Sequence, residues 1–349
     1  MTAGKILVAV SATPTPCGVE SFARRLDEAC GEDATEIVLT GRFREAKKLS
    51  VALRGARALV LNFPVVAWKR MLLTPLFALL VARAWGVPSV VIIHEWTDLA
   101  PARRFFVRLY AALASHILFS SPTVRAAYGR AGGVVPIPPN LKPPLKVEGS
   151  SASSIVAAAR AQGRFILGHF GSIYPRKQSG FVFEVAAELR RRGMNVVPVF
   201  VGSFIRGHDQ VEEEFRAKAA ETGFAGEYLV TGYLATEAEI FGIFNEVDSF
   251  VYSFAEGLTS RRGSVLACLE SGKPTIVNAP QADDEFEAHP TYRALLAEGA
   301  LRLVPTQATA ADYADAILSP WLPPPARPHL FEDAWADAAS ALRTALSAR

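Results

Sequence analysis

One segment of the chain combines charge, small hydroxyls and glycine between two apolar runs: EGLTSRRGSVLACLESGKPTIVN, residues 256–278. Glu256 follows a candidate strand, where a carboxylate can accept hydrogen bonds from both hydroxyls of a ribose. Gly257 and Gly263 allow the backbone to turn sharply, and an arginine pair adds positive charge beside them. The residue types therefore indicate a site for a ligand that is anionic at one end and carries a diol at the other.

The apolar part of the same segment is predicted to be a helix. Ser260 or Ser264 can cap its start, so that its first free amides face a bound anion. Gly272 ends the helix and Pro274 begins the next strand. A nucleoside diphosphate matches both chemical features of the segment. An ordinary loop with a core helix is the alternative, but it does not explain the charged RRGS insertion.

Two adjacent cations, Arg176 and Lys177, follow the candidate strand FILGHFGS. Cations in this position can clamp a diphosphate, whereas a solvated surface pair is the simpler interpretation. Lys177 precedes a helix, where a positive charge opposes the helix dipole. Because this placement does not stabilise the helix, we expect it to serve a bound anion.

Two further candidates lie in the first half of the chain. Gly18 stands in a loop that opens a helix, and the free amides of a helix start can bind an anion or a sugar hydroxyl. A plain strand-to-helix turn explains it equally well. His94 ends a strand, where it can bond a substrate hydroxyl, although a lone histidine is more often structural.

The elements that must position these residues alternate between strands and helices. In the first half, the apolar runs KILVAV, TEIVLT, ALVLNF, SVVIIH and HILFSS are predicted to be buried parallel strands, with SFARRLDEAC and LFALLVARAWG as helices. Alternation of this kind is typical of βαβ units and of a doubly wound sheet. The proline- and serine-rich run VVPIPPNLKPPLKVEGSSASS then interrupts the pattern and is predicted to join two domains.

The alternation restarts in the second half. Predicted strands are FILGHFGS, NVVPVFVGS, EYLVTGY, SFVYSF and PTIVN, and predicted helices are FVFEVAAELRRRG, VEEEFRAKAAETG, EAEIFGIFNEV and SVLACLESG. A second proline cluster, LPPPARP, precedes a final helix. In open parallel sheets, ligands bind beyond the carboxyl ends of the strands, which is where all the candidates above lie.

Composition narrows the class of protein. The chain has 349 residues, half of them apolar, which is too long for one ordinary core and indicates two domains. A net charge of +3 is unlike the concentrated basic face of a duplex-DNA binder and suits an enzyme that handles anionic small molecules, so no nucleic-acid partner is expected. Three cysteines without a C-x-x-C pair favour a reducing cytoplasm over a disulfide framework or a zinc site.

No segment is predicted to span a membrane. The N-terminal MTAGKILVAVSATP is interpreted as a first strand, not as a signal peptide. The most apolar run, Met71–Ala82, is shorter than the ~20 residues that a bilayer requires. We interpret it as a buried helix. The alternative is weak peripheral contact with the inner membrane face, because Trp68, Lys69 and Arg70 precede it.

Taken in order, these motifs resemble those of the GT-B glycosyltransferases, most closely glycosyltransferase family 4. The likeness covers nearly the whole chain and rests on CGVESFARRL, SVVIIHEW, FGSIYPRKQSGFVFEVAAELRRRG, VFVGS, VTGYLATEAEIFGIFNEVDSFVYSFAEGL and the opening segment. It implies an α/β protein of the GT-B class, with two doubly wound Rossmann-like domains facing an interdomain cleft. The expected parts are an acceptor-binding domain (1–145), a nucleotide-sugar-binding domain (146–325) and a C-terminal helix within 326–349 that packs back toward the first domain.

The resemblance also implies an activity. The expected enzyme is a retaining, metal-independent hexosyltransferase that uses a UDP- or GDP-linked sugar as donor and needs no cofactor. The implied acceptor is a glycan, a lipid-linked molecule or a small molecule, and the implied setting is bacterial surface polysaccharide or glycoconjugate synthesis. Fixed cations and helix-end amides would stabilise the charge that grows on the leaving diphosphate. No carboxylate pair of the glycosidase kind is evident.

Individual roles follow by matching positions. His94, Lys177 and Glu256 match the family's catalytic histidine near the donor sugar, its diphosphate lysine and its ribose-binding glutamate. The implied donor-binding set is Gly18, Gly171, Ser172, Arg176, Lys177, Gly202, Tyr233, Glu256, Gly257, Leu258, Thr259, Arg262, Gly263 and Ser264.

The chain departs from the family pattern at three places. A second glutamate is missing, since its place falls on Ser264 or, counted back from the Gly-Lys-Pro turn, on Ala267. Ser172 stands where an arginine is common, and Cys17 replaces the first glycine of the N-terminal pair. The missing acid and arginine motivate one alternative, a catalytically inactive GT-B-fold partner or scaffold of another transferase. A sugar-nucleotide epimerase is a further alternative, although its usual acid/base residues are not evident.

Overall fold

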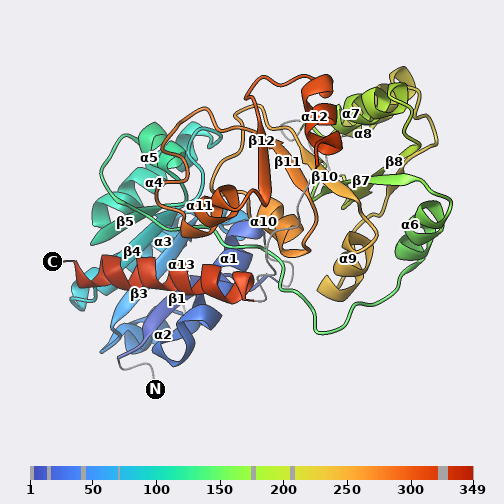
Figure 1. Cartoon of the computed structure of the whole chain (residues 1–349). Coiled ribbons are helices and arrows are strands. Elements are labelled where there is room, and N and C mark those ends of the chain that lie inside the picture. Colours follow the sequence, from blue (N-terminus) through green and yellow to red (C-terminus); the bar gives the residue numbers. More distant parts are fainter. Residues whose placement is uncertain are drawn as a thin grey trace. The chain divides into compact units, whose positions relative to one another are not determined.

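The computed structural model describes residues 4–13, 17–40, 45–69, 71–173, 178–204, 209–320 and 329–348 (Figure 1). The chain divides into two compact units. The N-terminal unit contains Met1–Asn140, Asp284–Pro290 and Glu332–Arg349, and the C-terminal unit contains Leu141–Asp283 and Thr291–Phe331.

The N-terminal unit is built on a six-stranded sheet in the order β2-β1-β3-β4-β5-β6, and every strand pair is parallel. Its strands are β1 (Ile6–Val10), β2 (Ala34–Val38), β3 (Ala58–Phe63), β4 (Ser89–Ile93), β5 (His116–Phe119) and β6 (Gly133–Val134). All residues of β1, β3 and β4 are buried, as the continuous apolar runs predict for strands covered on both faces.

Helices cover both faces of this sheet. They are α1 (Gly18–Cys30), α2 (Glu45–Leu53), α3 (Leu73–Ala84), α4 (Pro101–Leu113), α5 (Pro122–Tyr128) and α13 (Leu330–Ser347), with 3₁₀ turns at Gly31–Asp33 and Val66–Trp68. Figure 1 shows the final helix α13 beside α1. Trp335 of α13 lies against Phe22 of α1, with ring centroids 5.4 Å apart, and its Nε1 donates to the carbonyl of Pro139 at 3.2 Å.

A short segment from late in the chain, Asp284–Pro290, also belongs to the N-terminal unit. Thr123 donates its hydroxyl to the carboxylate of Glu285. The ring Nε2 of His289 lies 3.1 Å from the carbonyl oxygen of Ile137. Burial lowers the pKa of His289 to about 4, so this ring is neutral at physiological pH.

The C-terminal unit repeats the architecture with a second all-parallel, six-stranded sheet in the order β12-β11-β10-β7-β8-β9. Its strands are β7 (Phe165–Phe170), β8 (Val196–Val201), β9 (Leu229–Val230), β10 (Ser249–Tyr252), β11 (Thr275–Asn278) and β12 (Leu301–Val304). Its helices are α6 (Ser151–Ala161), α7 (Phe181–Arg191), α8 (Asp209–Glu221), α9 (Glu237–Phe244), α10 (Gly263–Glu270), α11 (Pro290–Ala297) and α12 (Ala310–Leu318).

One core of the C-terminal unit lies between its sheet and the helices α7, α8 and α12. Phe183 and Phe200 stand at its centre, and their rings are 5.1 Å apart. Local chemistry starts several helices: Thr236 and Thr309 each form a capping box with an acid three residues later.

The predicted α/β class with two doubly wound, Rossmann-like parts is confirmed, and each predicted strand corresponds to a strand of the structure. The sequence analysis missed β6 and the edge strand β12. The predicted apolar helix is α3, with 12 residues. Throughout the residues that the structure describes, helices are either too short or too polar to cross a bilayer.

Asp27 on α1 offers a test of this packing. Burial, followed by the nearby charges of Glu36 and Glu28, raises its pKa to about 6. The folded state therefore binds more protons than the unfolded chain between the ordinary pKa of 3.8 and about 6, so the free energy of unfolding falls as pH rises through this window. Because Asp27 is only half-buried, we expect Asp27→Asn to stabilise the protein by roughly 1 kcal/mol at about pH 8.

Urea unfolding at about pH 8 and about pH 5 measures the effect, and the gain is expected to shrink at the lower pH. Glu32→Gln is the matched control, because Glu32 is an exposed acid in the 3₁₀ turn that follows the same helix and is not among the charges that shift the pKa of Asp27. Equal gains for both variants, or a gain that does not change with pH, would contradict the assignment to Asp27.

Candidate functional site

The C-terminal unit has a topological switch point between β7 and β10. From β7 the chain moves outward to β8 and β9, then returns to add β10, β11 and β12 on the other side. The loops that follow β7 and β10 therefore leave the sheet edge in opposite directions. Ligands of open α/β sheets bind at such points, outside the carboxyl ends of the strands.

A pair of glycines brings the loop after β7 against the loop after β8. Gly171 has a φ of +117° and Gly202 a φ of +150°. A Cβ on Gly202 would lie 2.3 Å from the carbonyl oxygen of Gly171, so only glycine allows this approach. Ser172 is exposed at the same edge. The predicted Arg176 and Lys177 lie outside the described residues.

The loop after β10 is fixed by the last residue of β11. The side-chain carbonyl of Asn278 accepts from the amide of Phe254 at 3.0 Å, and its amide donates to the Phe254 carbonyl at 2.8 Å and to the Thr306 carbonyl at 3.1 Å. The backbone carbonyl of Asn278 also accepts from the amide of Leu258 at 3.0 Å. Asn278 was not among the predicted site residues, although a polar residue that ends an apolar strand is a signal that could have identified it.

Gly257 lies at the tightest point of this loop. Its φ is +72°, and a Cβ there would come within 2.1 Å of the carbonyl oxygen of Ala279. Leu258 and Thr259, both in the predicted donor-binding set, are buried directly after it. The loop therefore presents Glu256, which is 31% exposed, above a buried and closely packed base.

Glu256 is held by both arginines of the segment. Its Oε1 accepts from Nη2 of Arg262 and from Nη2 of Arg261, the latter at 3.2 Å. The Arg262 guanidinium also lies 4.4 Å from the ring centroid of Phe254. Both of these bonds end on one oxygen, whereas a carboxylate has about four acceptor positions. Two guanidinium groups therefore hold a single carboxylate.

The predicted serine cap of the following helix is wrong. The helix α10 begins at Gly263, and its N-cap residue is Arg262, where no described side chain makes a capping bond. Ser264 instead lies in the first turn. The buried Tyr292 donates its hydroxyl to the carbonyl of Arg262 at 2.9 Å. This contact at the helix start comes from a residue 30 positions away, which local sequence does not reveal.

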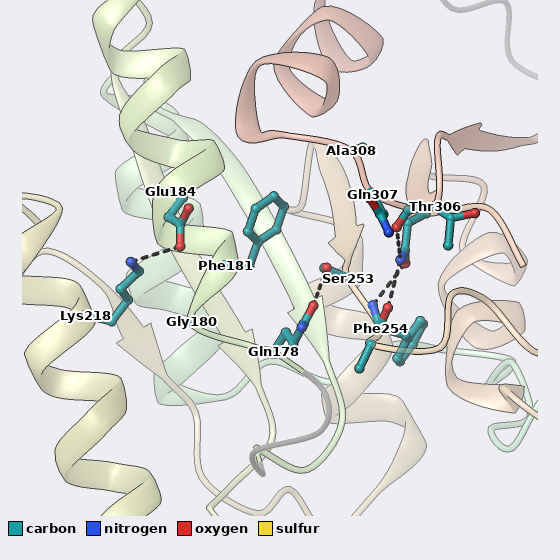
Figure 2. A pocket seen from close by; sticks show the side chains of 12 residues that line it. Gln178, Gly180, Phe181, Glu184, Lys218, Ser253, Phe254, Thr306, Gln307 and Ala308 are labelled. Carbon is teal, nitrogen blue, oxygen red and sulfur yellow. Dashed lines mark hydrogen bonds and ion pairs between the residues drawn. The ribbon is translucent and has the colours of Figure 1, made fainter. Parts of the chain in front are cut away.

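A pocket of about 510 Å³ opens at this edge of the sheet (Figure 2). Its lining comes from the ends of β10, β11 and β12 and from α7 and α8: Gln178, Gly180, Phe181, Glu184, Lys218, Ser253, Phe254, Ala255, Asn278, Thr306, Gln307 and Ala308. Ser253 donates its hydroxyl to Oε1 of Gln178 at 2.7 Å, which joins the two sides of the switch point. At the far side, Lys218 pairs with Glu184 at 2.9 Å, and this bond raises the pKa of the lysine.

None of the predicted donor-binding residues that the structure describes lines this pocket. Gln178 and Ala255 are the sequence neighbours of Lys177 and Glu256, so the pocket adjoins the predicted set. Tyr233, which follows β9, is 85% exposed. Within the described part of the chain, no group of three His, Cys, Asp or Glu side chains could hold a metal ion.

The remaining predicted residues, His94 and Gly18, lie in the N-terminal unit. The Nε2 atom of the buried His94 is 2.9 Å from Oδ1 of Asn62, and its backbone carbonyl accepts from the hydroxyl of Ser120 at 3.0 Å. Gly18 opens α1 and is exposed, and a Cβ there would meet no atom of the described residues within 4 Å. Sterics therefore do not require a glycine at this position.

A buried carboxylate follows Gly18. Glu20 accepts from the amide and the hydroxyl of Ser11 at 2.8 and 2.7 Å, and Arg24 donates to it at 3.3 Å. Ser11 follows β1 and Asn62 lies in β3, so these polar groups flank the switch point of the N-terminal sheet, which falls between β1 and β3. Neither Glu20 nor Asn62 was predicted. Asn62 is a polar residue near the end of an apolar strand, which is again the available signal, whereas Glu20 lies in the first turn of α1.

No protein-family model matches the chain, and no curated protein matches it significantly. Solved structures do resemble it. Anabaena HepE in complex with UDP and glucose is 16% identical with a TM-score of 0.59, over 98% of this chain and 95% of that chain. Sucrose-phosphate synthase from Thermosynechococcus elongatus is 16% identical with a TM-score of 0.56, over 98% and 95% of the two chains.

A glycosyltransferase from Rickettsia africae is 12% identical with a TM-score of 0.54, over 99% of this chain and 95% of that chain. At these identities the likeness establishes the fold. The expected GT-B class, with its two Rossmann-like parts, is thereby confirmed.

We expect Gly257→Ala to destabilise the C-terminal unit by about 3 kcal/mol or more, because the new methyl group meets the Ala279 carbonyl as well as an unfavourable φ. Gly272→Ala is the matched control: its φ of +71° is nearly the same, but no described atom lies within 4 Å of the new Cβ. That control is expected to cost about 1–2 kcal/mol. Urea unfolding compares the two, and equal losses would show that the close approach at Gly257 is not a constraint.

Proposed function

We propose that the chain is a retaining glycosyltransferase that transfers a sugar from a UDP- or GDP-linked donor to a glycan, a lipid-linked molecule or a small-molecule acceptor. The observation that carries the proposal is the arginine-held Glu256 beside a pocket of about 510 Å³ at the switch point of the C-terminal sheet. The fold likeness supports it, because the Anabaena HepE structures contain UDP, or UDP-glucose.

In this proposal Glu256 accepts hydrogen bonds from the ribose hydroxyls. The two arginine bonds orient the carboxylate, and its remaining acceptor positions receive the diol. Removing water from a carboxylate beneath a bound nucleoside costs free energy unless the carboxylate is paired with a positive charge. The two arginines form such pairs before the nucleoside binds.

The proposed chemistry proceeds at the anomeric carbon. The bond from this carbon to the diphosphate oxygen breaks, and its electron pair stays on the diphosphate. The acceptor hydroxyl attacks from the same face, and its proton passes to the departing phosphate oxygen, so the configuration is retained. Cations of the chain itself, Lys177 and Arg176, stabilise the leaving diphosphate.

The N-terminal unit is proposed to bind the acceptor and to place His94 near the donor sugar. The contact with Asn62 and the bond from Ser120 restrict the position of this histidine, which a catalytic contact requires. The proposed setting is bacterial surface polysaccharide or glycoconjugate synthesis in the cytoplasm.

A catalytically inactive GT-B partner or scaffold is the second candidate, and specific residues favour it. Neither position for a second glutamate carries an acid: Ser264 lies in the first turn of α10 and Ala267 is fully buried. Ser172 also offers no positive charge where an arginine is expected.

Nucleotide binding tests the proposed site. We expect thermal unfolding to shift upward with one of UDP or GDP, since a ligand at 100 times its Kd stabilises by about 2.7 kcal/mol. Glu256→Gln and Lys177→Ala are each expected to remove most of that shift, because one loses the ribose contact and the other a diphosphate contact. Glu188→Gln is the control, because Glu188 is likewise bonded by two arginines, Arg191 and Arg192, but lies on α7 away from the sheet edge.

An unchanged shift in both site variants would overturn the site assignment. Radiolabelled donor then separates the two functions. Hydrolysis or transfer by the pure protein with EDTA present supports the transferase, whereas nucleotide binding without turnover on any acceptor supports the scaffold. Conversion of the donor to an epimer without acceptor would contradict both.

A further inference from the structure

One backbone position at the pocket of the C-terminal unit is strained. Gln178, which lines this pocket just before α7, has a φ of +44°. Among the residues that the structure describes, it is the one non-glycine residue with a positive φ, and it is exposed. A glutamine in the left-handed region costs free energy, and an exposed side chain gains no core packing in return. Strained positions of this kind cluster at ligand sites, and the contacts of Gln178 agree with such a role.

The backbone that follows this glutamine is anchored to the sheet. Ser179 is buried, and its hydroxyl lies 3.2 Å from Nε2 of His169 in β7. The Nδ1 atom of the same ring lies 2.9 Å from the carbonyl oxygen of Val251 in β10. The carbonyl of Gln178 accepts from the amide of Phe181 at 2.8 Å. The left-handed turn is therefore held in place, so that the glutamine side chain leaves it in a defined direction.

The side chain of Gln178 is oriented by a residue on the other side of the switch point (Figure 2). The hydroxyl of Ser253, which follows β10, donates to Oε1 of Gln178 at 2.7 Å. Because the carbonyl end of the amide takes this bond, the two N–H groups on Nε2 are left for other acceptors. No described residue accepts a hydrogen bond from them. Ser253 therefore orients an amide whose donors are available to a ligand in the pocket.

The first amides of α7 do not supply the same donors. The amide of Phe181 donates to the carbonyl of Gln178, as described above. The amides of Val182 and Phe183 donate to the carbonyls of Ser179 and Gly180 at 3.2 and 3.1 Å. These three amides are thus already bonded within the turn, whereas the donors of the glutamine side chain are not.

The lining of the pocket favours an uncharged group with hydroxyls. Among the described lining residues, the charged side chains are Glu184 and Lys218, which pair with each other at 2.9 Å. The other lining side chains are amides, hydroxyls and apolar groups. An anion in this pocket would lose water without gaining an unpaired cation, whereas sugar hydroxyls would meet amide and hydroxyl partners. Phe254 is 1% exposed, so its ring offers no face on which a nucleobase could stack.

We propose that this pocket receives an uncharged sugar carried by the donor, and that Gln178 determines specificity by donating from Nε2 to one of the sugar's hydroxyl oxygens. Ser253 is a positioning residue, because it acts on the sugar through Gln178. The inference rests on the proposed transferase function, since it names the class of sugar that the donor carries. Neutral hexoses are accepted, whereas uronic acids are disfavoured because their carboxylate would be desolvated without a counter-charge.

Isothermal titration calorimetry with the full chain tests the proposal. The probes are the nucleotide that binds the wild type, UDP or GDP, and its hexose conjugate, UDP-glucose or GDP-mannose. The ratio of the two affinities measures the contribution of the sugar. We expect Gln178→Gly to lower this ratio about fivefold, because one hydrogen bond to the sugar is lost, and to leave the affinity for the bare nucleotide unchanged. Glycine adopts the left-handed φ freely, so this variant adds no backbone strain.

Ser253→Ala is expected to lower the ratio by a smaller factor, because the amide keeps its donors but loses its orientation. The double variant is expected to lose no more than Gln178→Gly alone, since Ser253 acts through Gln178. Gln162→Gly is the matched control, because Gln162 is an exposed glutamine directly after α6, before β7 begins. Thermal unfolding without ligand checks that each variant is folded.

The wild type is also expected to bind the uronic acid conjugate of the same nucleotide about tenfold more weakly than the hexose conjugate. An unchanged affinity ratio in Gln178→Gly, with nucleotide binding intact, would overturn this inference and leave the transferase proposal standing. Equal losses for the nucleotide and its hexose conjugate would also overturn it, because the pocket would then hold the nucleoside. If the wild type bound neither UDP nor GDP, the proposed function would fail together with the inference.

Discussion

The side chain of Asn278 bonds the backbone of Phe254 through both its amide and its carbonyl, and the candidate site depends on this clamp. Together with the backbone bond from the Leu258 amide to the Asn278 carbonyl, it fixes the loop after β10 to the end of β11. Because of it, Gly257 passes close to the Ala279 carbonyl and Glu256 emerges at a defined position beside the pocket. A polar side chain at the end of a buried strand thus holds the neighbouring loop in a fixed position relative to the sheet.

The position of Glu256 also depends on the charged side chains around it. Glu256 is a negative charge that two positive partners, Arg261 and Arg262, hold in place. Stacking of Arg262 on Phe254 connects this charge cluster back to the residue that Asn278 holds. Geometry and charge at the switch point are therefore coupled, so that a change in either the clamp or the arginines alters the position of the same carboxylate.

Sequence predicted those parts of the molecule whose cause is local. The strands of both sheets were recognisable because buried parallel strands require continuous apolar runs. The strand β12 was missed because Arg302 interrupts its apolar pattern. In the structure its guanidinium bonds the carbonyls of Ala316, Ser319 and Pro320, which makes a charged residue acceptable at the sheet edge. The start of α10 and the lining of the pocket were also missed. There the contacts of Tyr292, Asn278 and Thr306 join residues that are far apart in sequence, so no local pattern reveals them.

The path of the chain has a consequence for how this protein can be divided. It crosses between the units four times, after Asn140, Asp283, Pro290 and Phe331. A gene fragment that stops at the first crossing would lack Trp335, His289 and Glu285, all of which complete the N-terminal unit. Recombination with a related gene would have to carry the short middle segment and the terminal helix together with the first 140 residues. The two units are thus encoded by interleaved segments of the chain, although each has a sheet of its own.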